Sequence, residues 1–170
     1  MSNVRYLEAP ENFVSKNTDP LFLFKVFLAG GITGVPDWQS EVVAKVRLIA
    51  GYSKPFMNTP APSDILLMNP RRANFPMDDP KAARQQIEWE FHHLRTADVL
   101  SFWFAAEAIQ PITLFEYGYW LGQNKPLIVG CDPNYPRRQD VLIQTGLARP
   151  GLPIYSNLDS ICSEIVYKAC

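Results

Sequence analysis

The chain has 170 residues, of which 47% are hydrophobic and 19% are charged, and its formal net charge is −1 at pH 7. This balance excludes a disordered chain and indicates a soluble globular protein, and such a small net charge argues against a protein whose main task is to grip a nucleic acid backbone. The length suits one domain with a full hydrophobic core.

The sequence indicates a cytoplasmic protein. Its three cysteines, Cys131, Cys162 and Cys170, are odd in number and lack metal-ligand spacing, so we expect reduced thiols. No apolar run is long enough to span a membrane, and the N-terminus lacks the basic region and apolar core of a signal peptide. We therefore expect neither a membrane nor a nucleic acid polymer as a partner.

Strands and helices are expected to alternate from residue 25 onward. Residues 1–24 are expected to be an N-terminal extension, of which residues 21–24 either dock on the domain or lengthen the first strand. The apolar residues 26–29 predict a buried strand, and apolar side chains at helical spacing predict a helix over residues 37–50. The second strand is expected at residues 65–68.

A glycine-rich segment, Gly30-Gly31-Ile32-Thr33-Gly34, joins the first strand to the first helix. One interpretation is a tight turn. The other is a loop whose backbone amides closely approach a ligand, which makes Gly30, Gly31 and Ile32 candidate binding residues. The segment lacks the GxGxxG spacing, so no dinucleotide cofactor is predicted.

A helix with a polar face is predicted to follow the second strand. It begins at Asp79 or Pro80, since proline suits the first turn of a helix, and it runs to residue 96. Its buried face is predicted to contain Ile87, Phe91 and Leu94.

A short helix over residues 111–122 lies between two apolar runs, residues 98–104 and 126–130, which predict buried strands. This order is typical of a crossover in a parallel sheet. Glu116 is expected in the first helical turn, above the carboxyl ends of the strands, where open α/β sheets bind their ligands. Its apolar and aromatic neighbours solvate a carboxylate poorly, which favours a raised pKa or a specific partner.

The same stretch has a second interpretation. Thr113-x-x-Glu116 matches a capping box, in which Thr113 caps the helix and Glu116 reaches back to the Thr113 amide. The two interpretations are compatible.

The C-terminal part predicts a short helix around residues 140–145, a fifth strand at residues 153–155 and a last helix capped by Asn157. The chain is therefore predicted to form one α/β domain over residues 25–170. We expect a doubly wound, flavodoxin-like fold: a five-stranded, mainly parallel sheet in the order 2-1-3-4-5, with helices on both faces.

Six motifs together resemble a known family. Residues 26–32, 96–99 and 114–118 occur in the order seen in the nucleoside 2-deoxyribosyltransferases and the related 2′-deoxynucleoside 5′-monophosphate N-hydrolases. The nucleoside 2-deoxyribosyltransferase-like branch is the more similar one. The motifs of that branch are Asn-Pro-Arg-Arg at 69–72, Ile-Glu-Trp-Glu at 87–90 and Arg-Arg-x-Asp-Val at 137–141. The resemblance covers about residues 25–145.

The resemblance implies a catalytic pair. A Glu in the position of Glu116 is the family's nucleophile: it attacks C1′ of the sugar, expels the base and holds a covalent glycosyl intermediate. The family's second acid lies eight residues before Asp98, which is Glu90 here, one methylene longer than the usual Asp. Glu90 is the expected general acid, and the alternative is a solvated helix residue.

The resemblance also suggests binding residues. Gln110 occupies the position of an acid that binds the sugar hydroxyls in many transferases, and Thr113 or the Gln110 amide could replace it. Aromatic residues that either stack on a base or belong to the core are Phe27, Trp38, Trp89 and Trp103.

Arginines follow two of the predicted strands. In the turn at 69–72, Asn69 and Arg71 are candidate binding residues, and Arg138 is a third; with Arg72 and Arg137 they could hold a 5′-phosphate. The alternative is ion pairing with Asp78, Asp79, Asp132 or Asp140.

The leading hypothesis is an enzyme that cleaves the N-glycosidic bond of a nucleoside or nucleotide and passes the 2-deoxyribosyl group to another base or to water. A phosphoribohydrolase is disfavoured, because only Thr113-x-x-Glu116 of its longer motif is present. A nucleotide-binding or sensing module without turnover is the other alternative. No cofactor and no metal site are predicted, since the only histidines, His92 and His93, lack a third ligand. A homo-oligomer is expected from the family.

Overall fold

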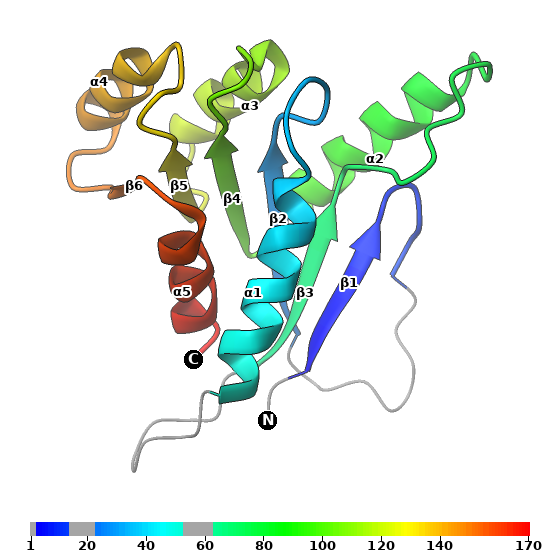
Figure 1. Ribbon diagram of the computed structural model, residues 1–170, viewed down its shortest axis with the longest axis horizontal. Helices are drawn as coiled ribbons and strands as arrows, with labels where there is room; N and C mark the ends of the chain where they lie inside the picture. The colour runs from blue at the N-terminus through cyan, green and yellow to red at the C-terminus, as the bar shows by residue number, and fades with distance from the viewer. Residues whose placement is uncertain (1–2, 14–22, 53–62) are drawn as a thin grey trace.

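A central parallel sheet organises the computed structural model, which describes residues 3–13, 23–52 and 63–170. Its six strands have the order β1-β3-β2-β4-β5-β6, and neighbouring strands pair in parallel throughout this order (Figure 1). The strands are β1 (Val4–Glu8), β2 (Leu23–Gly30), β3 (Asp64–Asn69), β4 (Val99–Phe104), β5 (Leu127–Cys131) and β6 (Ile154–Tyr155).

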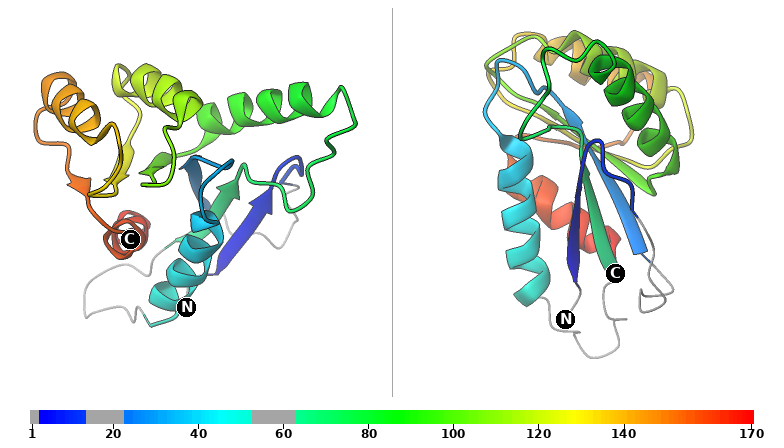
Figure 2. Two further views of the ribbon diagram at one scale, coloured as in Figure 1. Left: turned by 45° about the horizontal axis from the view of Figure 1, so that its top comes forward. Right: turned by 90° about the vertical axis from the view of Figure 1, so that its right-hand side faces the viewer.

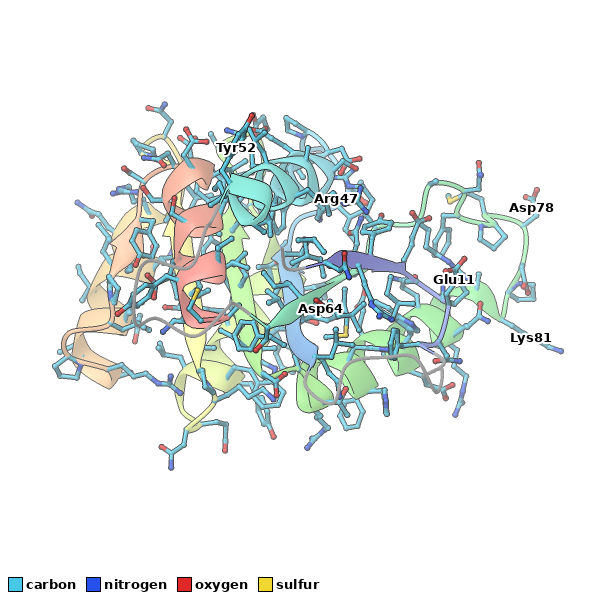
Figure 3. All side chains as sticks on the ribbon, turned by 90° about the horizontal axis from the view of Figure 1, so that it is seen from below. Glu11, Arg47, Tyr52, Asp64, Asp78 and Lys81 are labelled. Carbon is cyan, nitrogen blue, oxygen red and sulfur yellow. The ribbon has the colours of Figure 1, made fainter. Side chains whose placement is uncertain are left out.

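Five helices cover both faces of the sheet. They are α1 (Trp38–Tyr52), α2 (Ala82–Thr96), α3 (Pro111–Leu121), α4 (Arg138–Ala148) and α5 (Leu158–Lys168). Helices α1 and α5 pack side by side over one face, and α2, α3 and α4 pack over the other (Figure 2). Seen from below, Tyr52 and Arg47 of α1 lie on one face, and Asp78 and Lys81 lie at the outer end of the segment that leads into α2 (Figure 3).

The predicted doubly wound fold is confirmed, with one strand more than expected. The five expected strands are β3, β2, β4, β5 and β6 in space, which is the predicted order 2-1-3-4-5. The sixth, β1, comes from the segment expected to be an extension and pairs with β3 from Val4–Ile65 to Glu8–Asn69. Only Leu7 of β1 is buried, so this edge strand lacks the long apolar run that identified the others. Leu23 and Phe24 lengthen β2, as one interpretation predicted, and residues 14–22 lie outside the described residues.

The capping-box prediction is wrong. Helix α3 begins at Pro111, with Gln110 as its N-cap residue and no side-chain cap. Proline suits the first helical position, because its fixed backbone angle is helical and it has no amide to leave unpaired. Thr113 therefore lies inside the helix, and Glu116 lies in the second turn rather than the first.

The predicted buried face of α2 is also wrong in part. Leu94 is buried, but Ile87 and Phe91 are 64% and 59% exposed. Trp89 and His93 take the inward face instead, with their rings stacked at 4.0 Å. The indole N–H of Trp89 donates to the Glu11 carbonyl at 2.6 Å, so the largest side chain of the helix is buried with its polar atom satisfied.

The last helix begins as predicted. The Asn157 side chain accepts a hydrogen bond from the Ser160 amide at 2.9 Å, which satisfies one of the free amides in the first turn of α5.

Candidate active site

A cavity of about 530 Å³ lies at the carboxyl ends of β2 and β3, beside the N-terminus of α3. The strand arrows point to this end of the sheet (Figure 1), and residues of both α2 and α3 line the cavity. Most of the residues predicted from the sequence line it together: Phe27, Gly30, Gly31, Ile32, Glu90, Gln110, Thr113 and Glu116.

Two carboxyl groups face this largely apolar cavity. Burial raises the pKa of Glu116 from 4.5 to about 8, and the nearby Glu90 carboxylate adds to the rise. Burial also raises the pKa of Glu90, and a hydrogen bond from Gln86 opposes that rise. The two acids therefore interact electrostatically, as expected for a pair that shares one site.

Helix α3 is held in place by hydrogen bonds to Thr145 of α4 and to Arg149, which directly follows α4. Tyr117, next to Glu116, donates its phenol hydrogen to Thr145 Oγ1 at 2.5 Å, and Thr145 in turn donates to the Val141 carbonyl. At the C-terminal end, the Arg149 guanidinium donates to the carbonyls of Trp120, Leu121 and Lys125. These contacts satisfy carbonyls that a helix end leaves unpaired, and they tie α3 to the end of α4.

Both polar groups of the Gly31 backbone, its amide and its carbonyl, form hydrogen bonds with side chains. Its amide donates to Gln110 Oε1 at 2.9 Å. Its carbonyl accepts from Trp38 Nε1 at 3.1 Å and from Gln39 Nε2 at 3.3 Å. The glycine loop thus presents a fixed backbone to the cavity.

The side chain of Gln110 is committed to the protein itself. While its oxygen holds Gly31, its Nε2 donates to the carbonyls of Ala105 at 3.0 Å and Ala108 at 3.3 Å. A Cβ atom on Gly31 would lie 2.7 Å from two carbons of Gln110, so any larger residue there would displace the Gln110 side chain. Gln110 lines the cavity, but its polar atoms position the loop.

Four of the predicted binding residues lie outside the cavity lining: Trp38, Asn69, Arg71 and Arg138. Trp38 is buried beneath the glycine loop. Asn69 Oδ1 accepts from the Arg71 amide, and its Nδ2 donates to Tyr6 Oη. These residues support the sheet edge around the cavity.

The arginines that were candidates for binding a phosphate form hydrogen bonds or ion pairs with other groups of the protein. Arg71 donates to Gln39 Oε1 at 3.0 Å and to the Pro36 carbonyl at 2.9 Å, and it pairs with Asp37 at 3.4 Å. Arg138 donates to the Cys131 carbonyl. The ion-pairing interpretation is confirmed for Arg137, which pairs with Asp140 at 3.0 Å.

Other residues of the site were missed by the sequence analysis. Ile87, Ile109 and Ile112 line the cavity, although their hydrophobicity alone predicts core positions. Gln86 was not predicted either. It lies four residues before Glu90, a spacing that places the two side chains next to each other on a helix and could have indicated their contact. Within the described ranges, no group of three or more His, Cys, Asp or Glu side chains could hold a metal ion, and no helix is long and apolar enough to cross a membrane.

Comparisons with known proteins agree with this architecture. The chain is similar to a solved structure described as a conserved protein from Enterococcus faecalis V583, with 14% identity, a TM-score of 0.58, and coverage of 86% of this chain and 99% of that one. This likeness supports the fold alone. A search of curated proteins gives no match. Residues 23–135 match the family described as "Nucleoside 2-deoxyribosyltransferase like", which is more than half of the chain. The protein therefore belongs to the nucleoside 2-deoxyribosyltransferase-like family.

Proposed function

We propose that the protein cleaves the N-glycosidic bond of a nucleoside through a covalent glycosyl intermediate on Glu116, and passes the 2-deoxyribosyl group to another base or to water. The observation that carries this proposal is a pair of carboxyl groups, Glu116 and Glu90, lining one apolar cavity with raised pKa values. Membership of the family supports the same chemistry.

The proposed reaction divides the work between the two acids. A Glu116 oxygen forms a bond to C1′ while the C1′–N bond breaks, and the electron pair of that bond passes to the base, which takes the proton of Glu90. The acceptor base or water then attacks C1′, releases Glu116 and returns a proton to Glu90. Two neighbouring carboxyls resist ionising together, so the pair holds one proton, and the productive form has it on Glu90.

The lining suggests how a substrate is held. Phe27 offers an aromatic surface for a base, and the backbone of Gly30, Gly31 and Ile32 offers close approach. Thr113 supplies a hydroxyl for the sugar.

We further propose a nucleoside rather than a nucleotide as the substrate. Of the described residues that line the cavity, none is Arg, Lys or His, whereas two are Glu. A 5′-phosphate would meet negative charge without a cation to hold it. We expect kcat/KM for 2′-deoxynucleosides to exceed that for their 5′-monophosphates by at least about tenfold, or about 1.4 kcal/mol. The opposite preference would contradict this prediction.

The test is incubation of the protein with each 2′-deoxynucleoside, with and without a free acceptor base, followed by chromatography. A new nucleoside indicates transfer, and free base alone indicates hydrolysis. Binding without any product would favour the alternative, a nucleotide-binding or sensing module. The observation that favours this alternative concerns Gln110. The family leads us to expect a sugar-binding acid at this position, whereas the polar atoms of Gln110 bond backbone groups of the protein.

We also propose a homo-oligomer that forms through apolar side chains around the cavity mouth. Large apolar residues are exposed on the two helices that contribute to the cavity: Ile87 and Ile112 line it, and Phe91 of α2 and Phe115 and Tyr119 of α3 are exposed on the same helices. Such a surface is typical of an interface. Light scattering over a range of concentrations should give a multiple of 19.3 kDa, and a constant monomer mass would contradict the proposal.

A further inference from the structure

Gln86 forms a bridge between Glu90 and the end of a strand. It lies one helical turn before Glu90 on α2, and its Nε2 donates to Glu90 Oε1 at 2.7 Å. The same nitrogen donates to the carbonyl of Pro70, directly after β3, at 2.6 Å. Both amide hydrogens of Gln86 are therefore used, and the Glu90 carboxyl is tied to the sheet edge.

The Pro70 carbonyl determines which way the Gln86 amide points. A carbonyl only accepts hydrogen bonds, so the nitrogen of Gln86, not its oxygen, must face Pro70. This arrangement leaves Gln86 Oε1 buried and without a partner among the described residues. An unpaired buried oxygen is unfavourable, so this orientation is maintained by the two hydrogen bonds that the Gln86 nitrogen donates.

The bridge also determines where Glu90 can carry a proton. Glu90 Oε1 faces an N–H donor, so a proton on that oxygen would place two donors against each other. Oε2 has no hydrogen-bond partner among the residues that the structure describes, and it is the oxygen that remains for the proton.

We propose that Gln86 is a positioning residue for catalysis: it holds Glu90 Oε1 as an acceptor, so that the proton for the leaving base is carried by Oε2. This inference rests on the proposed function. In the first step Glu90 Oε2 gives its proton to the departing base, which has received the electron pair of the C1′–N bond, and Glu90 becomes a carboxylate. The Gln86 hydrogen bond then stabilises the carboxylate that forms.

The test compares substrates that differ in their need for a proton. The base of an ordinary 2′-deoxynucleoside must be protonated as it departs. The base of 7-methyl-2′-deoxyguanosine already carries a positive charge, so it can depart without receiving a proton. Gln86→Met keeps the length of the side chain but removes both donors. It is expected to lower kcat for ordinary 2′-deoxynucleosides by about 10- to 100-fold, within the range of general acid catalysis, and to change kcat for the methylated substrate less than about twofold.

Gln85→Met is the matched control. Gln85 is the exposed neighbour on the same helix and contacts Arg72, so the same substitution there should leave both substrates unaffected. Equal losses for both substrates in Gln86→Met, or no loss for either, would overturn the positioning role. A wild-type protein that cleaves neither substrate would instead overturn the proposed function.

A titration of Glu90 tests the inference without turnover. Because the Gln86 hydrogen bond lowers the pKa of Glu90 against the effect of burial, Gln86→Met should raise that pKa. Carbon NMR of the labelled carboxyl group in the full-length protein gives this measurement. An unchanged or lowered pKa of Glu90 would contradict the proposed contact.

Discussion

Replacing Glu116 with Gln is expected to lower kcat by at least about 10³-fold, because the amide keeps the shape of the side chain but cannot attack C1′. The measurement is the rate of base release or exchange at saturating nucleoside. Glu88→Gln is the matched control, since Glu88 lies on the exposed side of α2 and pairs with Arg84 at 2.7 Å. If Glu116→Gln keeps the kcat of the wild-type protein, Glu116 is not the nucleophile.

The same substitution is expected to stabilise the protein at high pH. The folded protein raises the pKa of Glu116 from 4.5 to about 8, so its favourable contribution is complete below pH 4.5 and is lost as the pH rises through 8. One pKa unit corresponds to about 1.4 kcal/mol, so a rise from 4.5 to about 8 corresponds to roughly 5 kcal/mol, and Glu116→Gln should raise the free energy of unfolding at pH 9 by up to this amount. The two proteins should be equally stable near pH 4. Urea unfolding at both values measures the difference, and a less stable variant at pH 9 would contradict the burial of this carboxyl.

Replacing Glu90 with Gln is expected to have two separable effects. It removes the proposed general acid, so kcat for ordinary 2′-deoxynucleosides should fall by about 10²-fold or more. It also removes the negative charge that raises the pKa of Glu116, so that pKa should decrease. Burial remains as the larger cause, and the pKa of Glu116 should therefore stay above its ordinary value.

The pH profile of kcat/KM for 7-methyl-2′-deoxyguanosine reports this second effect. This substrate needs an ionised Glu116 but no proton, so its rate should rise with pH as Glu116 ionises, near pH 8 in the wild-type protein. In Glu90→Gln the rise should move to lower pH. A profile that stays in place or moves to higher pH would mean that the two carboxyls do not interact.

The fold was predictable wherever a strand is a continuous apolar run. The buried cores of β2 to β5 have this pattern, and the βα alternation gives their order. The edge strand β1 was missed because an edge needs only one buried side chain, Leu7. The buried face of α2 was misassigned because hydrophobicity favours Ile87 and Phe91, whereas the fold buries Trp89 and His93, whose ring nitrogens find backbone partners.

In the candidate site, the two acidic residues could be predicted from the sequence, but the contacts that hold the surrounding side chains could not. Glu116 was found from its apolar surroundings, and Glu90 only from the family spacing. The contacts of Gln39, Gln86 and Gln110 were not predictable, because each bonds a backbone group from another segment, and local sequence does not encode such a partner. The arginines give a further example: their type suggested a phosphate, but Arg71 bonds the Pro36 carbonyl in the loop before α1, and Arg138 bonds the Cys131 carbonyl.

Trapping the glycosyl intermediate tests the role of Glu116 most directly. A 2′-fluoro-2′-deoxynucleoside should react slowly, since fluorine destabilises the oxocarbenium-like centre in both the formation and the breakdown of the intermediate. Intact-protein mass spectrometry should show the addition of one fluorinated deoxyribosyl group, and peptide mapping should locate it on Glu116. An adduct on another residue, or turnover of 2′-deoxynucleosides that survives in Glu116→Ala, would contradict the proposed mechanism.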